Sequence, residues 1–277
     1  MRSYRTWFAR HRVGAFVVLA FGLSWWPWPF ALAHPDSEAM LSFGPVVAAV
    51  LVAALADGRS AVVSLARSVV QWRVARSTWA AAAVGPFALA GLTGVLAVAF
   101  GLVDADDFGD ALALSTWLAV PLLMLATGLL GGPLFEEVGW RGFFLPDLQR
   151  RHPALWSTAV VGSVWACWHL PLLITEPSGQ RPPLPFTVWV FAQAVLLTWL
   201  YNTSRGSVLI AIVFHTAANT AGRILLEPLV GETGFLGVWW LMATLYVTAA
   251  AAVIRRTGGH LGTTIQPLHH TITRRQP

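Results

Sequence analysis

Long apolar segments separated by short charged connections constrain the fold of this chain more than any other feature. A helix needs about 20 apolar residues to cross the hydrocarbon core of a membrane. Segments that approach this length cover residues 13–33, 40–56, 78–102, 112–135, 154–175, 186–202, 206–229 and 234–254. The sequence therefore predicts an all-α integral membrane protein with eight transmembrane helices and an intramembrane polar cavity.

The composition supports a membrane protein and argues against other classes. Charged residues make up 11% of the chain, whereas a soluble domain carries about 25%. The net charge of +5 comes from arginines in short clusters between apolar segments, so we expect no nucleic-acid partner. The single cysteine, Cys167, excludes an internal disulfide and a multi-cysteine metal site. We expect one polytopic domain over residues 1–277, with a membrane core at 13–254 and a cytoplasmic tail at 255–277.

The distribution of arginine predicts the orientation in the membrane. Cytoplasmic connections carry an excess of Lys and Arg. All 18 basic side chains are arginines, and only Arg181 and Arg223 lie near connections that are otherwise acidic. We therefore expect a multi-pass protein of the plasma membrane with both termini in the cytoplasm. Residues 31–33 resemble a signal-peptidase site, but the apolar stretch before them is long and rich in tryptophan, so we expect the first helix to be retained.

The connection at residues 57–77 alternates arginine with Val, Leu and Trp. One interpretation is an amphipathic helix that lies on the anionic cytoplasmic leaflet. The other is a plain positively charged loop. The sequence does not decide between these two interpretations.

Ionisable residues inside the apolar segments are the candidates for function, because they are costly at membrane depth. The fourth segment ends in Glu136 and Glu137, followed by Arg141. Glu137 and Arg141 are four residues apart and share one helix face, whereas Glu136 points about 100° away. We expect Arg141 to pair with Glu137 and Glu136 to face a cavity. A carboxylate that is poorly solvated and lies beside another becomes a better base, which suits general-base catalysis.

Two later segments carry histidines. His169 is followed by Pro171, and this proline should kink the helix near the histidine. His215 and Asn219 are four residues apart and share a face. A single histidine of this kind is usually structural, but three polar clusters in successive segments favour a shared site.

Depth in the membrane tests whether these groups can meet. His169 and His215 lie roughly 22 Å and 14 Å beyond the starts of their segments. Glu136 reaches a similar depth, roughly 21 Å, only if its helix continues to Arg150. We therefore expect a helix that runs on through residues 142–150, with a bend before Pro146.

With these residues identified, the chain resembles the CPBP family, the CAAX-protease and bacteriocin-processing intramembrane proteases also called Abi proteins, which include Rce-type prenyl endopeptidases. The family motifs are Glu-Glu-x-x-x-Arg, Phe-x-x-x-His and His-x-x-x-Asn on successive helices. Here they read EEVGWR at 136–141, WACWH at 165–169 and HTAAN at 215–219. One departure is Trp165, where the pattern prefers phenylalanine.

The resemblance implies a glutamic-type intramembrane protease that cleaves a membrane-anchored protein or peptide. Glu136 would be the general base that activates water, assisted by His169. His215 and Asn219 would stabilise the oxyanion, and Glu137 and Arg141 would order the site. Such chemistry needs an activated water and donors aimed at the developing negative charge.

Other interpretations remain open. Glu136, His169 and His215 together would supply the three ligands of a catalytic zinc site, although the metalloprotease signature His-Glu-x-x-His is absent. We expect no cofactor, with zinc as the alternative. A proton-coupled transporter also uses buried Glu and His, and a non-catalytic immunity or scaffold protein would share the fold. The substrate, including whether it is prenylated, and the oligomeric state cannot be read from the sequence.

Overall fold

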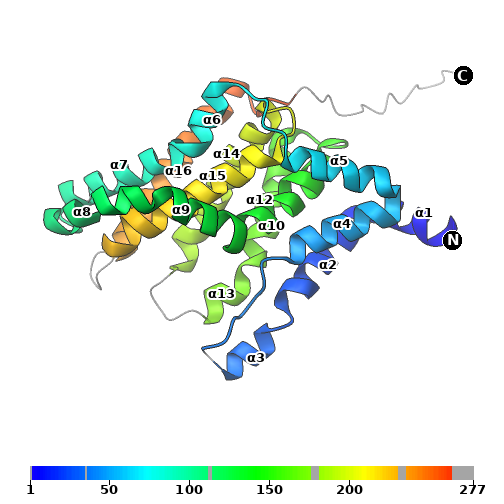
Figure 1. Ribbon diagram of the computed structural model, residues 1–277, viewed down its shortest axis with the longest axis horizontal. Helices are drawn as coiled ribbons and strands as arrows, with labels where there is room; N and C mark the ends of the chain where they lie inside the picture. Colours follow the sequence, from blue (N-terminus) through cyan, green and yellow to red (C-terminus); the bar gives the residue numbers. More distant parts are fainter. Residues whose placement is uncertain (1, 35, 112–113, 176–180, 230–234, 264–277) are drawn as a thin grey trace, which may run out of the picture.

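The computed structural model describes residues 2–34, 36–111, 114–175, 181–229 and 235–263, and these residues are helical without a β-strand (Figure 1). The first two residues of the expected fourth segment, the acidic Glu176 and Glu232, and the tail from residue 264 lie outside the described residues. The all-α fold is therefore confirmed for the part of the chain that the structure describes.

The helices and helical turns follow one another along the chain as α1 (Arg2–Arg10), α2 (Arg12–Trp25), α3 (Trp28–Ala33), α4 (Gly44–Asp57), α5 (Arg59–Val69), α6 (Arg76–Ala83), α7 (Gly85–Ala99), α8 (Ala105–Ala111), α9 (Leu114–Leu130), α10 (Pro133–Gly139), η1 (Trp140–Phe144), α11 (Leu145–Gln149), α12 (Ala154–Trp168), α13 (Leu170–Thr175), α14 (Pro183–Thr203), α15 (Val208–Ala221), η2 (Gly222–Leu226), η3 (Glu227–Leu229) and α16 (Phe235–Thr257). Several of them join into longer helical runs that pack as one bundle (Figure 1).

The number of candidate membrane spans is smaller than the eight expected. Six helical runs among the described residues are long and apolar enough: Arg12–Ala33, Arg76–Ala99, Ala154–Thr175, Pro183–Thr203, Val208–Leu229 and Leu236–Thr257. A bent pair, Trp117–Leu130 with Pro133–Gln149, makes seven if it counts as one span. The expected span at 40–56 is only the 14-residue helix α4, which is shorter than the roughly 20 residues that a full crossing requires.

The bent pair corrects the expected position of the bend. The two helices meet at 49° around Gly131 and Gly132, before the glutamates rather than before Pro146. Beyond the bend the helical run continues from Pro133 to Gln149, as the depth argument predicts. Near Pro146 the chain forms the π-helical turn η1, in which the Leu145 N–H donates to the Trp140 carbonyl. This wider turn accommodates a proline that has no N–H of its own and whose ring crowds the preceding turn.

The helix that carries His169 breaks where Pro171 predicts. Helix α12 ends at Trp168 and α13 begins at Leu170, which leaves His169 at the junction. The His169 N–H bonds to the carbonyl of Ala166, three residues back. The break therefore turns the chain at the histidine itself.

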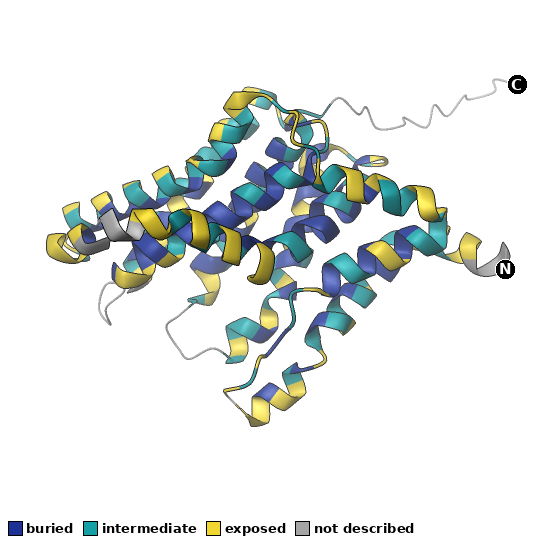
Figure 2. Cartoon of the chain, in the orientation of Figure 1, coloured by how far each residue is buried: buried dark blue, intermediate teal, exposed yellow. Residues whose placement is uncertain are grey.

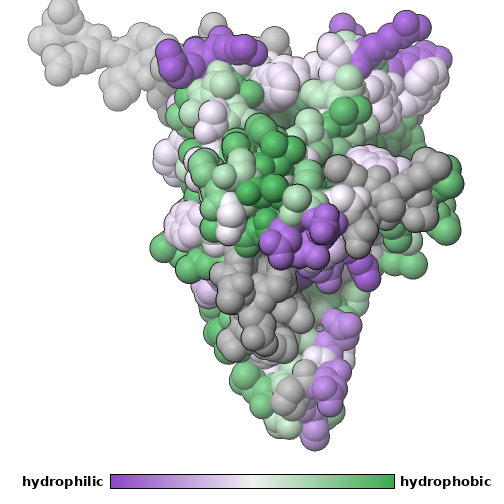
Figure 3. All heavy atoms as spheres, turned by 90° about the vertical axis from the view of Figure 1, so that its left-hand side faces the viewer, coloured by the Kyte–Doolittle hydropathy of each residue, from purple (hydrophilic) through white to green (hydrophobic). Residues whose placement is uncertain are grey.

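Buried residues gather on the central helices, whereas the outer helices expose apolar side chains (Figure 2). Helix α15 is the most buried of the candidate spans. In contrast, α9 exposes Leu118, Leu122, Leu125 and Leu129 along one face. Hydrophobic surface also covers much of the side in Figure 3, where hydrophilic groups lie along the upper edge and in patches lower down. This arrangement is typical of a bundle whose outer surface faces lipid.

Candidate active site

The two glutamates lie at the start of α10, directly after the bend. Gly132 precedes this helix with φ +112°, a conformation that residues with a side chain rarely adopt. A Cβ atom at Gly132 would lie 2.7 Å from Oε1 of Glu136. Glycine therefore allows the chain to bend and lets the Glu136 carboxylate fold back against the backbone.

Glu137 is the fully buried member of the pair. The Arg141 guanidinium donates to Oε1 of Glu137 at 2.9 Å, and neither side chain is exposed to solvent. The predicted pairing of Glu137 with Arg141 is thus present. The same oxygen also accepts a hydrogen bond from Nδ1 of His215 at 2.8 Å. Helical spacing does not predict this second contact, which links α10 to α15.

Glu136 has different surroundings from its neighbour. Its Oε2 accepts a hydrogen bond from the indole N–H of Trp165 at 2.7 Å. Glu136 is 5% exposed, compared with 0% for Glu137. Among the described residues, its other oxygen has no hydrogen bond. Glu136 is therefore the more exposed of the two carboxylates, and one of its oxygens is available to a water molecule.

Trp165 connects the separate parts of the site. The Arg141 guanidinium lies over its ring, 4.6 Å from the centroid. The His215 ring meets it edge-on at 5.3 Å, and the His169 ring lies 5.7 Å away, both between centroids. Trp165 therefore joins the candidate site, although the sequence indicated only its departure from the family motif. This departure from phenylalanine matters because only the indole has an N–H that can be donated to Glu136.

His169 is fixed by its own helix. Its Nδ1 lies 2.8 Å from the Trp165 carbonyl oxygen, which can only accept, so Nδ1 carries the proton. The ring packs edge-on against Trp168 and Phe186. The neutral ring is left with a lone pair on Nε2, which is suited to accept a proton.

Asn219 follows His215 by one turn of α15 and is half-buried. Within the described residues its side chain makes no hydrogen bond to Glu136 or His169. The structure thus gathers Glu136, Glu137, Arg141, His169 and His215 around Trp165, and it leaves Asn219 beside this cluster.

The alternative zinc site does not fit the arrangement of the side chains. In the part of the chain that the structure describes, no group of three or more His, Cys, Asp or Glu residues could hold a metal ion. The expectation that no cofactor is needed stays a prediction.

Several buried polar atoms of the site have no protein partner among the described residues. They include Oε2 of Glu137 and the Nε and Nη2 atoms of Arg141. The indole nitrogens of Trp140 and Trp168 are in the same situation. Buried polar groups of this kind commonly bind water, which a hydrolytic site requires.

Comparison with known proteins agrees with this site. Residues 116–221 match the family described as type II CAAX prenyl endopeptidase Rce1-like. The chain is also 28% identical over 172 residues to CAAX prenyl protease 2 of Methanococcus maripaludis, a match that covers 58% of this chain and 59% of that protein. The chain therefore matches somewhat more than half the length of this curated relative.

The matched segment contains all three motifs. Glu136, Glu137 and Arg141 lie within residues 116–221, as do His169, His215 and Asn219. The same segment includes the bend at Gly132 and the hydrogen bond between Trp165 and Glu136. The resemblance to the CPBP and Rce1-type proteases is therefore confirmed over the part of the chain that holds the candidate site.

Proposed function

We propose that this chain is an intramembrane endopeptidase of the CAAX-protease type that uses Glu136 to activate water. The observation that carries the proposal is the convergence of Glu136, Arg141, His169 and His215 on Trp165. These residues come from three helical runs, so packing rather than local sequence brings them together. A hydrolase needs a base and a charge-stabilising group at one point, and the cluster provides both.

Peptide hydrolysis would begin at the accessible oxygen of Glu136. This carboxylate removes a proton from water while the water oxygen attacks the carbonyl carbon of the substrate. Nε2 of His169 accepts a hydrogen bond from the same water and orients it. Glu136 then returns the proton to the amide nitrogen as the carbon–nitrogen bond breaks, which releases a free amine and a free carboxylate.

His215 would stabilise the oxyanion. Its Nδ1 donates to Glu137, so a second N–H is available on Nε2 only when the ring is protonated. Asn219 would supply the second donor from the next turn of α15. In this assignment Glu137 acts by positioning His215, and Arg141 balances the charge of Glu137.

The substrate would be a membrane-associated peptide or protein. The curated relative is named a CAAX prenyl protease, which favours a prenylated C-terminal peptide for this chain as well. The outer surface of the bundle is apolar, and such a surface tolerates a prenyl chain in the surrounding lipid. An experiment has to distinguish a prenylated peptide from other membrane peptides as the substrate.

The test compares membrane peptides from cells that contain the wild-type chain with those from cells that contain Glu136→Gln. Glutamine keeps an oxygen to accept the Trp165 hydrogen bond but cannot act as a base. We expect uncut precursors to accumulate with Glu136→Gln, and no accumulation with Asp106→Asn, which changes an exposed carboxylate of α8. Identical peptide patterns for all three proteins would contradict the proposal. Proton-driven uptake by purified protein in vesicles, without peptide products, would favour a transporter instead.

A further inference from the structure

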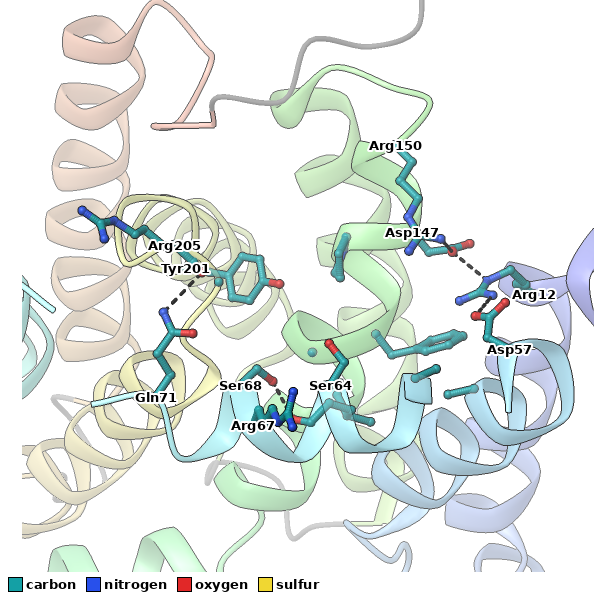
Figure 4. Close-up of a pocket in the computed structure, with 17 residues that line it drawn as sticks. Arg12, Asp57, Ser64, Arg67, Ser68, Gln71, Asp147, Arg150, Tyr201 and Arg205 are labelled. Carbon is teal, nitrogen blue, oxygen red and sulfur yellow. Dashed lines mark hydrogen bonds and ion pairs between the residues drawn. The ribbon is translucent and has the colours of Figure 1, made fainter. Parts of the chain in front are cut away.

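A polar cavity lies at the arginine-rich end of the bundle, and its lining includes none of the residues of the proposed active site. Its volume is about 400 Å³, within the range typical of small-ligand sites. The walls come from the start of α2, the end of α4, one face of α5, α11 and the turn between α14 and α15 (Figure 4). We refer to this cavity, defined by Arg12, Ser64, Arg67, Asp147, Arg150 and Tyr201, as the arginine pocket.

The arginine pocket has a surplus of positive charge. Four arginines and two aspartates line it, which leaves two positive charges uncompensated (4 − 2). Arg12 is paired with Asp57 and Asp147, and Arg150 reaches Asp147 at 3.3 Å. Arg67 has no acidic partner among the described residues. The Arg205 guanidinium points away from the centre in Figure 4, so the other three arginines and the two aspartates leave one positive charge inside the pocket (3 − 2).

The pocket also offers hydroxyl groups that nothing else uses. Figure 4 shows the hydroxyls of Ser64 and Tyr201 turned toward the interior. In the part of the chain that is described, neither hydroxyl makes a hydrogen bond. Guanidinium and hydroxyl donors around one cavity are the groups that recognise phosphate oxygens.

One wall of the pocket is fixed by reciprocal hydrogen bonds. The Gln71 side chain donates to the carbonyls of Ser204 at 3.0 Å and Arg205 at 3.3 Å. The Ser207 hydroxyl donates in return to the Gln71 carbonyl at 2.6 Å. The chain after α5 is thus fastened to the turn between α14 and α15, so the cavity has a defined shape.

The surroundings of the pocket favour a lipid over a soluble anion. The connection at 57–77, for which the sequence left two interpretations, contains the helix α5 (Arg59–Val69) with a single buried residue, Leu65. Directly after it, Trp72 is 63% exposed with the Arg73 guanidinium over its ring, and Val70 is also exposed. An exposed tryptophan beside arginines is typical of a surface that lies at the lipid headgroups.

We propose that the arginine pocket binds a phosphate-bearing anion, and that its source is the headgroup of an anionic phospholipid. The phosphate would lie between Arg67 and the hydroxyls of Ser64 and Tyr201, with the acyl chains beside Trp72. This site is separate from the proposed catalytic residues, so the proposal does not depend on peptide hydrolysis. By the positive-inside rule it would face the cytoplasmic leaflet.

The test measures binding to the purified full chain in neutral detergent by native mass spectrometry. The probes are short-chain phosphatidylglycerol, short-chain phosphatidylcholine and inorganic phosphate. We expect phosphatidylglycerol to bind, and Arg67→Gln to weaken that binding about tenfold, because the variant removes a charge-assisted hydrogen bond to the phosphate. Arg59→Gln removes an exposed arginine of the same connection that does not line the pocket, so it should change binding less than about twofold. Tyr201→Phe gives a second variant that removes one donor and keeps the ring.

The possible outcomes separate the sources of the anion. Inorganic phosphate binding that depends on Arg67, without selective binding of phosphatidylglycerol, would support an anion site but overturn the lipid assignment. Equal losses for Arg67→Gln and Arg59→Gln would indicate general surface attraction and overturn the site. Equal binding of phosphatidylglycerol and phosphatidylcholine would also overturn the proposal of an anion-binding site. Melting temperatures close to wild type for each variant exclude a loss caused by unfolding.

Discussion

Arg141 and Arg150 belong to one helical run but have opposite surroundings. Arg141 is 0% exposed, with its charge neutralised by Glu137 and its guanidinium stacked on Trp165. The Arg150 side chain is 64% exposed and reaches Asp147 at 3.3 Å in the wall of the arginine pocket. The interior cluster is therefore closed, which means that its charges are paired with one another and shielded from solvent. The loss of one member would leave its partner unpaired in a poorly polar environment. The end cluster remains open to solvent and keeps a surplus of charge for a ligand.

The strongest test of this contrast is Arg141→Met. It leaves Glu137 buried without its cation, and breaking one side of a buried pair costs about 3–5 kcal/mol. We expect a loss of that size in the free energy of unfolding, measured by denaturant titration in detergent micelles. If the Arg141→Met variant is as stable as wild type, Glu137 is neutral or is satisfied by His215 alone. The interior cluster would then not be closed.

A second test changes the bend that brings Glu136 into the interior cluster. Gly132→Ala introduces a side chain at φ +112°, with its Cβ 2.7 Å from Oε1 of Glu136. Strain of this kind costs about 1–3 kcal/mol, and we expect lower stability together with slower peptide cleavage. The control is Gly91→Ala in α7, where a Cβ meets nothing within 4 Å. Equal behaviour of the two variants would contradict the proposed contact at Gly132.

Trp165→Phe separates the indole N–H from the rest of the ring. The variant restores the residue that the family pattern prefers, but it removes the donor to Glu136. We expect kcat for peptide cleavage to fall about tenfold with KM nearly unchanged, because Trp165 positions the base rather than the substrate. Trp156→Phe, at an exposed site on the same helix, is the control. An unchanged kcat would assign Trp165 to packing alone.

The smallest effect is expected at the other end of the helical run. Arg150→Met removes an exposed partner of Asp147, and exposed ion pairs contribute at most about 1 kcal/mol. Asp147 keeps its contact with Arg12. The free energy of unfolding should therefore change far less than in Arg141→Met. Similar losses in the two variants would remove the distinction between a closed interior cluster and an open end cluster.

The fold was predictable where it depends on composition and on residues that interrupt a helix. Apolar segments predicted a helical membrane protein, and Pro171 predicted the break at His169. The expected eight spans are not confirmed, since α4 has only 14 residues and the bend lies at Gly131 and Gly132. Hydropathy averages over a window, so it does not register a short helix or a glycine pair that changes direction.

The candidate site was predictable as a set of residues but not as a set of contacts. The pairing of Glu137 with Arg141 followed from their spacing of four residues. The hydrogen bond from Trp165 to Glu136 spans 29 residues, and that from His215 to Glu137 spans 78. Helical periodicity determines neighbours only within a turn or two, so it does not specify partners on another helix.

The sequence by itself determined the helical class, the three motifs and the faces that their residues share. It did so because hydrophobicity and the 3.6-residue period act locally. Only the tertiary structure decided that Glu136 is bonded to Trp165 and that Glu137 is shared by Arg141 and His215. Those partners are set by how α10, α12 and α15 pack, and packing depends on side chains far apart in the chain.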